Sequence, residues 1–292
     1  MKTNGTLNIR VLTHNIRYAT SSPFRGEKPW ADRRQRLINE LLYHSRQNPM
    51  IFICLQEVLH SQLEDILSGL NAEGGEEWAY IGVGRNDGKE AGEYSPIFYR
   101  PAVWIQEAWD TVWLSETPSI PSKGWDAAST RIVTIGVFKH QLSRQRVLGM
   151  STHLDDQGSK SRYEAAGLIL QQVDNYLHRG EFGGQIAGNF LAGDFNSEEF
   201  QEAYTKLTSS NSPLVDTLKQ VDSVLQYGNV NTYTGFGYEN EPPKRIDYVL
   251  VGPRNESGLP WKVQGYAVLP NVFDDGVMLS DHRAVVADVE LR

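Results

Sequence analysis

The sequence predicts one α/β domain over residues 1–292, in which mixed β-sheets carry helices on their outer faces. Three observations support this prediction: short strand-like runs recur along the chain, amphipathic helical stretches separate some of them, and others follow one another across short loops. Strands that alternate with helices indicate parallel βαβ units, whereas consecutive strands indicate antiparallel pairs. Both kinds of pairing are therefore expected, and no repeat or Pro- or Ser-rich linker interrupts the pattern.

The first half of the chain alternates strands and helices before it turns to consecutive strands. Strand patterns cover 7–13 and 50–55, and an amphipathic helix is predicted between them over 31–47, with Asp32 near its N-terminus. A second helix is predicted over 61–70, with Ser61 as its N-cap. Strands are then expected over 78–83, 95–99 and 103–113.

The second half repeats this mixture. Strands are predicted over 131–140 and 147–152, a long helix over 159–177, another strand over 186–192 and a short helix over 197–207. Three late strands are expected over 244–251, 263–269 and 283–291.

Composition narrows the class of protein. No apolar run approaches the roughly 20 residues of a membrane-spanning helix, and the N-terminus has no apolar signal-like segment. We therefore expect a cytoplasmic or other intracellular protein, although a secreted protein without its leader would give the same pattern. The single cysteine, Cys54, lies in an apolar run and is interpreted as a core residue rather than a catalytic thiol.

The formal net charge of −8 disfavours a tight, non-specific nucleic-acid binder, which usually presents a basic surface to phosphates. A nuclease stays possible on this evidence, because a bound metal supplies positive charge where the scissile phosphate lies.

Polar residues gather just past the predicted strand ends, where active sites commonly form. The candidates are Asn15, Glu57, His153, Asp194 with Asn196, Asp281 with His282, and Asp247, which lies at the start of or within a strand. Carboxylates and amides with few thiols favour Mg²⁺ or Mn²⁺ over zinc, and the histidines can donate hydrogen bonds to a phosphoryl oxygen. These are the groups that phosphate-ester hydrolysis needs.

Each candidate also has an ordinary structural explanation. Glu57 could be a surface charge, residues 194–196 a turn, His153 part of a solvated acidic loop, and residues 280–282 an N-cap and turn. Asp247 is harder to explain in this way, because an ionised carboxylate within a strand needs a partner. The occurrence of the whole set in one chain favours function.

Six short motifs in a fixed order resemble the exonuclease, endonuclease and phosphatase superfamily, across residues 7–291. They are Asn-Ile-Arg-Tyr (15–18), Leu-Gln-Glu-Val (55–58), Ser-Thr-His-Leu-Asp (151–155), Gly-Asp-Phe-Asn-Ser (193–197), Arg-Ile-Asp-Tyr-Val (245–249) and Ser-Asp-His-Arg (280–283). The resemblance implies a deoxyribonuclease I-like four-layered α/β sandwich, in which two packed, mostly antiparallel sheets are flanked by helices.

The resemblance also implies roles for the metal-binding side of the site. Glu57 would be the main metal ligand, helped by Asn15 and Asp281, and the metal would be Mg²⁺ or Mn²⁺. Whether one or two ions bind is left open by the motifs.

For the catalytic side, the resemblance implies that Asp194 orients or deprotonates the attacking water, supported by Asn196. His282 would contact the scissile phosphate, with Asp247 fixing the orientation of its ring. His153 would donate to another phosphate oxygen.

Segments between the motifs resemble a microbial and fungal branch of the superfamily that has no defined substrate. They are residues 80–85, 92–100, 113–118 and 124–128.

Arg17 is a candidate clamp for a second phosphate oxygen, with a salt bridge to a nearby acid as the alternative. Tyr94 and Trp125 are candidates for stacking on a substrate, with packing as half-buried rim aromatics as the favoured alternative.

The predicted function is hydrolysis of a phosphate ester on a small phosphorylated molecule: a sugar phosphate, inositol phosphate, nucleotide or lipid headgroup. No dense basic loop is present to hold a polyanion, and the acidic segments 73–77 and 155–156 would repel one if they lie near the site. A nuclease or RNA 3′-end trimming enzyme that binds nucleic acid is the alternative, and a catalytically silent binding module is a third. A monomer is expected.

Overall fold

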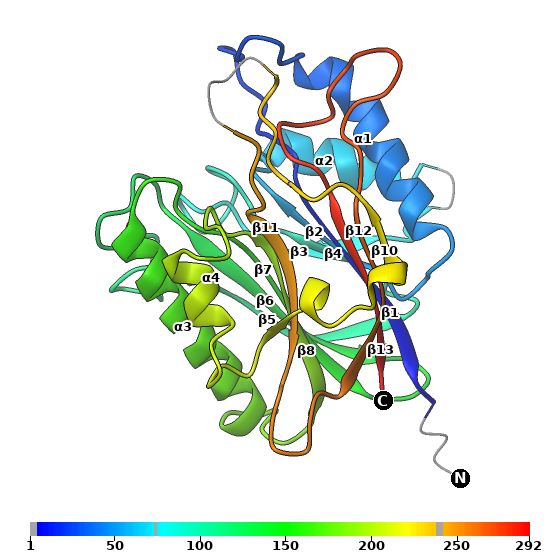
Figure 1. The fold of residues 1–292 in the computed structure, drawn as a ribbon, viewed down its shortest axis with the longest axis vertical. Helices are drawn as coiled ribbons and strands as arrows, with labels where there is room; N and C mark the ends of the chain where they lie inside the picture. Colours follow the sequence, from blue (N-terminus) through cyan, green and yellow to red (C-terminus); the bar gives the residue numbers. More distant parts are fainter. Residues whose placement is uncertain (1–4, 73–74, 238–241) are drawn as a thin grey trace.

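The computed structural model describes residues 5–72, 75–237 and 242–292, which form two packed β-sheets with helices outside them (Figure 1). One sheet has seven strands in the order β10-β12-β13-β1-β2-β4-β3. Its strands are β1 (Leu7–Asn15), β2 (Phe52–Gln56), β3 (Ala79–Ile81), β4 (Ile97–Tyr99), β10 (Gln226–Gly228), β12 (Trp261–Val268) and β13 (Val285–Leu291).

The other sheet has six strands in the order β5-β6-β7-β8-β11-β9. They are β5 (Trp104–Trp113), β6 (Ile132–His140), β7 (Arg146–His153), β8 (Ile186–Asp194), β9 (Val215–Asp216) and β11 (Asp247–Gly252). Parallel pairing joins β1 to β2, β10 to β12 and β7 to β8, and the other neighbours are antiparallel. The expected mixed, mostly antiparallel sheets are therefore confirmed.

Helices cover the outer face of each sheet. Helices α1 (Trp30–Ser45) and α2 (His60–Leu70) bury Leu37, Leu41 and Leu63 against the seven-stranded sheet. Helices α3 (Ser159–His178) and α4 (Glu202–Leu207) cover the six-stranded sheet on the opposite side of the molecule (Figure 1). Two short 3₁₀ helices, η1 (Thr217–Lys219) and η2 (Ser223–Leu225), lie between β9 and β10. This is the predicted four-layered sandwich.

The core between the sheets is built around an aromatic cluster. The ring of Phe52 on β2 lies 4.9 Å from Trp104, 4.8 Å from Phe138 and 5.1 Å from Phe190, measured between ring centroids. Cys54 is fully buried in the same core, where burial raises the pKa of its thiol. Its interpretation as a core residue is confirmed.

Several element boundaries differ from the prediction. Helix α2 begins at His60, so Ser61 lies in its first turn, and the side chain of Gln62 accepts a hydrogen bond from the Leu59 backbone N–H at 3.2 Å. The N-cap predicted at Ser61 is therefore wrong. Helix α4 begins at Glu202 rather than 197, and β11 begins at Asp247 rather than 244, because Lys244 pairs with Tyr233 outside the sheet. The short strands β9 and β10 have no sequence counterpart.

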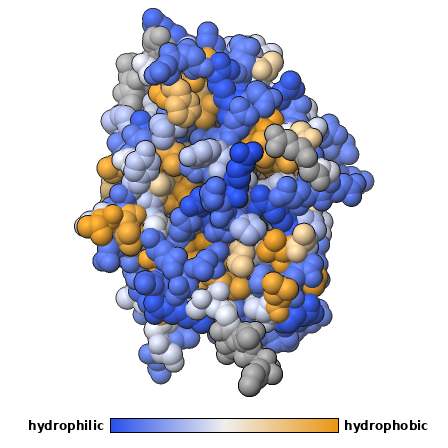
Figure 2. All heavy atoms as spheres, turned by 90° about the vertical axis from the view of Figure 1, so that its right-hand side faces the viewer, coloured by the Kyte–Doolittle hydropathy of each residue, from blue (hydrophilic) through white to orange (hydrophobic). Residues whose placement is uncertain are grey.

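The molecular surface is mainly hydrophilic on the face shown in Figure 2, where apolar residues form separate patches. Helix α1 illustrates how this arises, since it buries Leu37, Ile38 and Leu41 and turns Arg34 and Arg36 outward. Within residues 5–72, 75–237 and 242–292, no helix is both long and apolar enough to cross a membrane.

Candidate active site

The strand register places three of the predicted site residues side by side on neighbouring strands. In the six-stranded sheet, Asp194 at the end of β8 is paired with His153 on β7 and with Asp247 on β11. In the seven-stranded sheet, Asn15 ends β1 beside Gln56 of β2, and Glu57 follows directly. Because parallel strands end at the same edge of a sheet, each sheet places its polar side chains at one edge.

A backbone connection joins the two sheets at these edges. Residues 232–234 pair with Lys244, just before β11, and with the segment just before β13: Thr234 N–H donates to the Asp281 carbonyl and Arg283 N–H donates to the Thr232 carbonyl. The Thr232 hydroxyl oxygen accepts from the N–H of Asp247 at 3.0 Å. These bonds bring Asp247 and His282 together from distant parts of the chain.

A cavity of about 510 Å³ opens between the strand ends of the two sheets. It is lined by seven of the residues singled out from the sequence: Arg17, Glu57, His153, Asp194, Asn196, Asp281 and His282. Asn15 and Asp247 lie fully buried directly behind these residues. Side chains from all six motifs therefore converge on one place.

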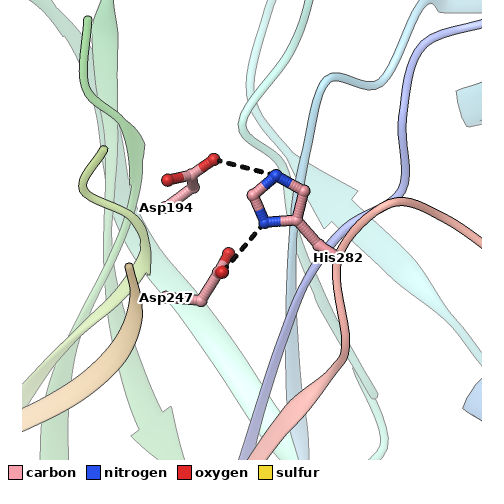
Figure 3. Close-up of side chains that lie close together, drawn as sticks. All are labelled: Asp194, Asp247 and His282. Carbon is pink, nitrogen blue, oxygen red and sulfur yellow. Dashed lines mark hydrogen bonds and ion pairs between the residues drawn. The ribbon is translucent and has the colours of Figure 1, made fainter. Parts of the chain in front are cut away.

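His282 lies between two carboxylates (Figure 3). Its Nδ1 is 2.9 Å from Asp247 Oδ2, and its Nε2 is 3.6 Å from Asp194 Oδ2. Burial opposes a charge on the ring, but the carboxylates of Asp247 and Asp194 outweigh it and raise the pKa of His282 to about 10. The imidazole is therefore protonated at neutral pH, and Asp247 fixes its orientation.

Asp194 lies at the centre of the site. Burial and the charge of Asp247 raise the pKa of Asp194 to about 7, against the opposing effect of His282. Its Oδ2 accepts from the Asn15 amide at 3.0 Å, and its Oδ1 accepts from the Asn196 backbone N–H at 2.8 Å. A carboxyl group with its pKa in this range is suited to accept a proton from water.

Asn15 links the two sheets through its amide nitrogen, which donates to Asp194 and, also at 3.0 Å, to Glu57 Oε1. Its amide oxygen instead accepts from the Arg17 backbone N–H at 3.0 Å. In this orientation Asn15 is a donor between two carboxylates, and the oxygen that the sequence offered as a metal ligand faces the backbone.

Glu57 and Asp281 are two acidic residues that line the cavity. Burial raises the pKa of Asp281, and the charge of Glu57 raises it further, against the opposing effect of His282. Glu57 Oε2 accepts from the Tyr18 N–H at 3.2 Å, and Asp281 Oδ1 accepts from the Ser280 hydroxyl at 3.1 Å. Two mutually repelling carboxylates in one cavity have the donor chemistry that Mg²⁺ or Mn²⁺ requires.

Arg17 lines the cavity, but its guanidinium is held by an acid. Its Nε and Nη2 donate to the Glu27 carboxylate at 3.2 and 3.4 Å, and its Nη1 lies 3.8 Å from Glu57. Arg17 therefore forms the salt bridge to an acid that was the alternative to a phosphate clamp. A contact between Arg17 and a substrate phosphate stays a prediction.

His153 has a defined tautomer. The Asn196 side-chain nitrogen donates to the Leu154 carbonyl at 3.0 Å and lies 3.1 Å from His153 Nε2, so its second hydrogen points to that ring nitrogen. Nε2 is then an acceptor and Nδ1 carries the proton. Burial and the nearby guanidinium groups of Arg131 and Arg85 lower the pKa of His153 well below its usual value. Any hydrogen bond that neutral His153 donates to a substrate must come from Nδ1.

Two predicted substrate contacts lie away from the cavity lining. Tyr94 is 3% exposed, and its hydroxyl donates to the Lys89 carbonyl at 2.8 Å and contacts His60 Nδ1 at 2.9 Å. Trp125 is half-buried, and its backbone N–H donates to the Glu116 carboxylate. Tyr94 is therefore packed inside the protein, and stacking of Trp125 on a ligand stays a prediction.

The cavity wall contains three charged residues that sequence reasoning did not select as a group. Arg85 and Glu93 form a two-bond pair at 2.8 Å each, and Arg131 is held by Asp155 and Asp156. Arg85 and Glu93 lie in the segments that resemble the microbial branch, but nothing in their spacing shows that they face the site.

A further missed residue is Arg33 on α1, which is fully buried. Its guanidinium donates to the backbone carbonyls of Lys28, Ile16, Leu279 and Arg17, at 2.9, 2.8, 2.6 and 3.1 Å. It therefore joins the loop after β1 to the segment that precedes Asp281 and His282.

Asp155 is not the solvated charge that the sequence suggested. It is 1% exposed and accepts from the backbone N–H groups of Ala128, Ser129, Gln157 and Gly158. Burial opposes its ionisation, but these N–H groups and Arg131 lower the pKa of Asp155 to about 2. Asp156 beside it does line the cavity, and part of the other acidic segment, residues 73–74, lies outside the described residues.

We expect Asp155→Asn to destabilise the fold more at neutral pH than at acid pH. A carboxylate with a depressed folded-state pKa adds stability that is present above its unfolded pKa and is lost as the pH falls toward the folded value, here from about 4 to about 2. Urea unfolding at pH 7 and pH 3 should show a stability gap between parent and variant that narrows at the lower pH. A gap of equal size at both pH values would contradict this role.

Comparisons with known proteins agree with this architecture. A family model described as the endonuclease/exonuclease/phosphatase family matches residues 5–282. A solved structure of an endonuclease/exonuclease/phosphatase from Bacteroides vulgatus is 30% identical, with a TM-score of 0.82 over 98% of this chain and 99% of that chain. The mannosyl-6-phosphatase of Bacteroides thetaiotaomicron is also 30% identical, with a TM-score of 0.81 over 96% of this chain and 99% of that chain.

More distant structures share the fold alone. The human Nocturnin catalytic domain is 18% identical, with a TM-score of 0.69 over 98% of this chain and 95% of that chain. A search of curated proteins found no match. Since the family model spans nearly the whole sequence, the chain belongs to the endonuclease/exonuclease/phosphatase family, whose members are hydrolases of phosphate esters.

Proposed function

We propose that the protein is a divalent-metal-dependent phosphoesterase that hydrolyses a phosphate ester on a small phosphorylated molecule. The supporting observation is the gathering of three carboxylates, Glu57, Asp194 and Asp281, around one cavity with the protonated ring of His282. A cation bound by carboxylates, a base beside it and a charged donor together meet the needs of attack by water on phosphorus.

Two groups of side chains are candidates for holding the metal. Asp194, Asp247 and His282 have ligand atoms within 4.8 Å of one another. However, the imidazolium of His282 already neutralises charge there, and both of its ring nitrogens face carboxylates. Glu57 and Asp281 repel each other, and the cation nearest to Glu57, Arg17, is already held by Glu27, so we assign the metal to Glu57 and Asp281.

When bound, Mg²⁺ or Mn²⁺ would neutralise the non-bridging phosphoryl oxygens and make a bound water more acidic. Asp194 would orient the attacking water and accept its proton, since its raised pKa of about 7 makes it an effective base near neutral pH. His282, held by Asp247, would donate a hydrogen bond to the phosphoryl group and stabilise its growing charge. Asn196 would keep Asp194 and His153 in place through its backbone and side-chain contacts.

The size and charge of the cavity favour a small substrate. Its volume of about 510 Å³ lies in the range of small-molecule sites. The wall guanidinium groups of Arg85 and Arg131 are already paired with Glu93 and Asp156, so they attract the further phosphates of a strand only weakly. The similarity to the Bacteroides thetaiotaomicron mannosyl-6-phosphatase supports a phosphomonoester in particular.

We expect EDTA to abolish hydrolysis of p-nitrophenyl phosphate and Mg²⁺ or Mn²⁺ to restore it. Without a bound cation, the carboxylates of Glu57 and Asp281 repel the phosphoryl oxygens of the substrate. Initial rates across a metal titration provide the measurement. Parallel assays with bis(p-nitrophenyl) phosphate, single-stranded DNA and poly(A) separate the candidate activities. Full activity in EDTA would overturn the metal requirement, and strand degradation at low enzyme concentration would favour the nuclease alternative.

A further inference from the structure

Directly behind the site, a buried histidine contacts the backbone of His282. His14 precedes Asn15 at the end of β1 and is fully buried. Side chains alternate along a strand, and the amide of Asn15 reaches Asp194 between the sheets. His14 therefore points to the outer layer, where α1 covers the sheet and places Glu40 beside it (Figure 1). The proposed reaction gives His14 no role.

Each ring nitrogen of His14 faces an oxygen atom. Its Nε2 lies 3.2 Å from the carbonyl oxygen of His282, and its Nδ1 lies 2.9 Å from Oε1 of Glu40. A carbonyl oxygen has no hydrogen to give, so Nε2 carries the hydrogen and donates it to His282. Pairing with Glu40 at the other nitrogen fixes the orientation of the ring, as a carboxylate does for many functional imidazoles. The side chains of His14 and Glu40 are 0% and 7% exposed, so water does not compete for these contacts.

The bond from His14 lies just beyond the end of a β-ladder. Strands β1 and β13 pair as far as Thr13 and Val285, so the segment 280–284, which carries His282, lies outside this ladder. The N–H of His282 donates to the Ser280 hydroxyl oxygen of the same segment at 3.2 Å. Its carbonyl instead accepts from His14. The side chain of His14 thus ties this segment to β1 where the main-chain pairing has ended.

Helix α1 carries Glu40 on its buried face. Arg33, Leu37 and Glu40 follow one another at intervals of four and three residues, which places them on one side of the helix. Leu37 packs into the core, Arg33 binds backbone carbonyls of the loop after β1, and Glu40 pairs with His14. Two polar side chains of α1 therefore reach the site from its outer side, and Glu40 does so through His14.

We propose that His14 and Glu40 are positioning residues for His282. The carboxylate of Asp247, 2.9 Å from Nδ1 of His282, fixes the rotation of its ring (Figure 3). His14 instead holds the main chain from which this ring projects, and so sets where its Nε2 stands beside Asp194. A misplacement of about 1 Å can lower an enzymatic rate about 100-fold, so this backbone contact matters for turnover. The inference rests on the proposed function for its effect on turnover but not for its effect on the placement of the ring.

Histidine-selective ¹⁵N NMR measures the environment of the His282 ring without turnover. His282→Gln identifies the ring signals of His282 among those of the seven histidines. We expect His14→Phe, which keeps a flat ring but removes the donor, to shift these signals. His14→Gln should return them close to those of the parent, because an amide nitrogen can donate the same bond. Recovery with glutamine separates the hydrogen bond from the packing of the ring.

Steady-state kinetics with p-nitrophenyl phosphate in saturating Mg²⁺ provide the second measurement. His14→Phe is expected to lower kcat about 10- to 100-fold and to change KM by less than about twofold, because it displaces a ring that acts on the transition state. His14→Gln should recover most of this loss. Glu40→Leu should lower kcat by less than His14→Phe, since the donor at Nε2 is kept and only its orientation is released.

The matched control is His140→Phe. His140 is also buried, at 5% exposed, and it ends β6 outside the cavity lining. Its ring packs against Trp104 and its Nδ1 lies 3.0 Å from the Ser143 hydroxyl. We expect this change to lower the unfolding free energy but to leave kcat and the His282 signals as in the parent.

Parent-like His282 signals in His14→Phe, a loss of kcat that His14→Gln does not reduce, or an equal loss in His140→Phe would overturn the positioning role. If His14→Phe fails to fold, Glu40→Leu decides: shifted His282 signals with a lowered kcat support the role, and parent-like values of either contradict it. Failure of the proposed function has a different readout, since the unaltered protein would hydrolyse no phosphate ester in Mg²⁺ while the NMR shifts would persist.

Discussion

Asp194→Asn is expected to lower kcat for phosphate-ester hydrolysis by about 100- to 10,000-fold, the range that general acid–base groups contribute. The amide can neither accept a proton from water nor balance the charge of His282, whose Nε2 lies 3.6 Å away. The shape of the side chain is kept, and the amide oxygen can still accept from the Asn196 N–H, but the amide nitrogen cannot accept from Asn15 as the carboxylate oxygen does. Steady-state kinetics with p-nitrophenyl phosphate in saturating Mg²⁺ would measure the loss.

The same variant should remain folded at pH 7 without added metal. Burial and Asp247 raise the pKa of Asp194 to about 7, so ionising this carboxyl in the folded protein is unfavourable, and the amide removes that cost. The matched control is Asp288→Asn, because Asp288 pairs with Arg10 outside the cavity lining. Parent-like kcat in Asp194→Asn, or an equal loss in Asp288→Asn, would rule out the assigned role.

Arg33→Met is expected to destabilise the fold by about 3–5 kcal/mol, the range for removing one partner of a buried charged network. The change leaves four backbone carbonyls without their donor and removes a positive charge close to Glu27, Asp281 and Glu57. Urea unfolding, followed by circular dichroism and tryptophan fluorescence, would measure the change in unfolding free energy.

Arg36→Met on the same helix is the control. Its guanidinium forms an exposed ion pair with Asp275 at 2.6 Å, and such pairs contribute less than about 1 kcal/mol. Arg33→Lys should recover only part of the loss, because an ammonium group restores the charge but cannot reach acceptors from three segments at once. Equal effects of Arg33→Met and Arg36→Met would show that the buried contacts do not stabilise the loops.

Much of the fold could be predicted because apolar periodicity and strand ends are local properties. The strands that end at Asn15 and Asp194 were predicted within a few residues, and the buried carboxylate expected to need a partner, Asp247, has one in His282. The order of strands within each sheet was not predicted. That order depends on pairings between distant segments, such as β1 with β13, which no local pattern encodes.

The site residues were predicted less completely than the fold, because the type of a residue does not show which groups surround it in the folded chain. An arginine in an amphipathic helix is ordinarily solvated, so nothing in the sequence distinguishes buried Arg33 from exposed Arg36. The sequence offers Tyr94 as a candidate for stacking on a substrate, yet the chain folds its ring beneath the loop that carries Arg85 and Glu93.

The backbone connection through residues 232–234 has a consequence for how the chain tolerates substitution. Main-chain hydrogen bonds, together with the bond from the Asp247 N–H to the Thr232 hydroxyl, fix the spacing between Asp247 and His282 without depending on the packing of the interior. Repacking of the aromatic interior around Phe52 can then alter the separation of the sheets at their far ends while the imidazole keeps its carboxylates. The residues of the hydrophobic interior can therefore change while the site residues at the strand ends keep their geometry.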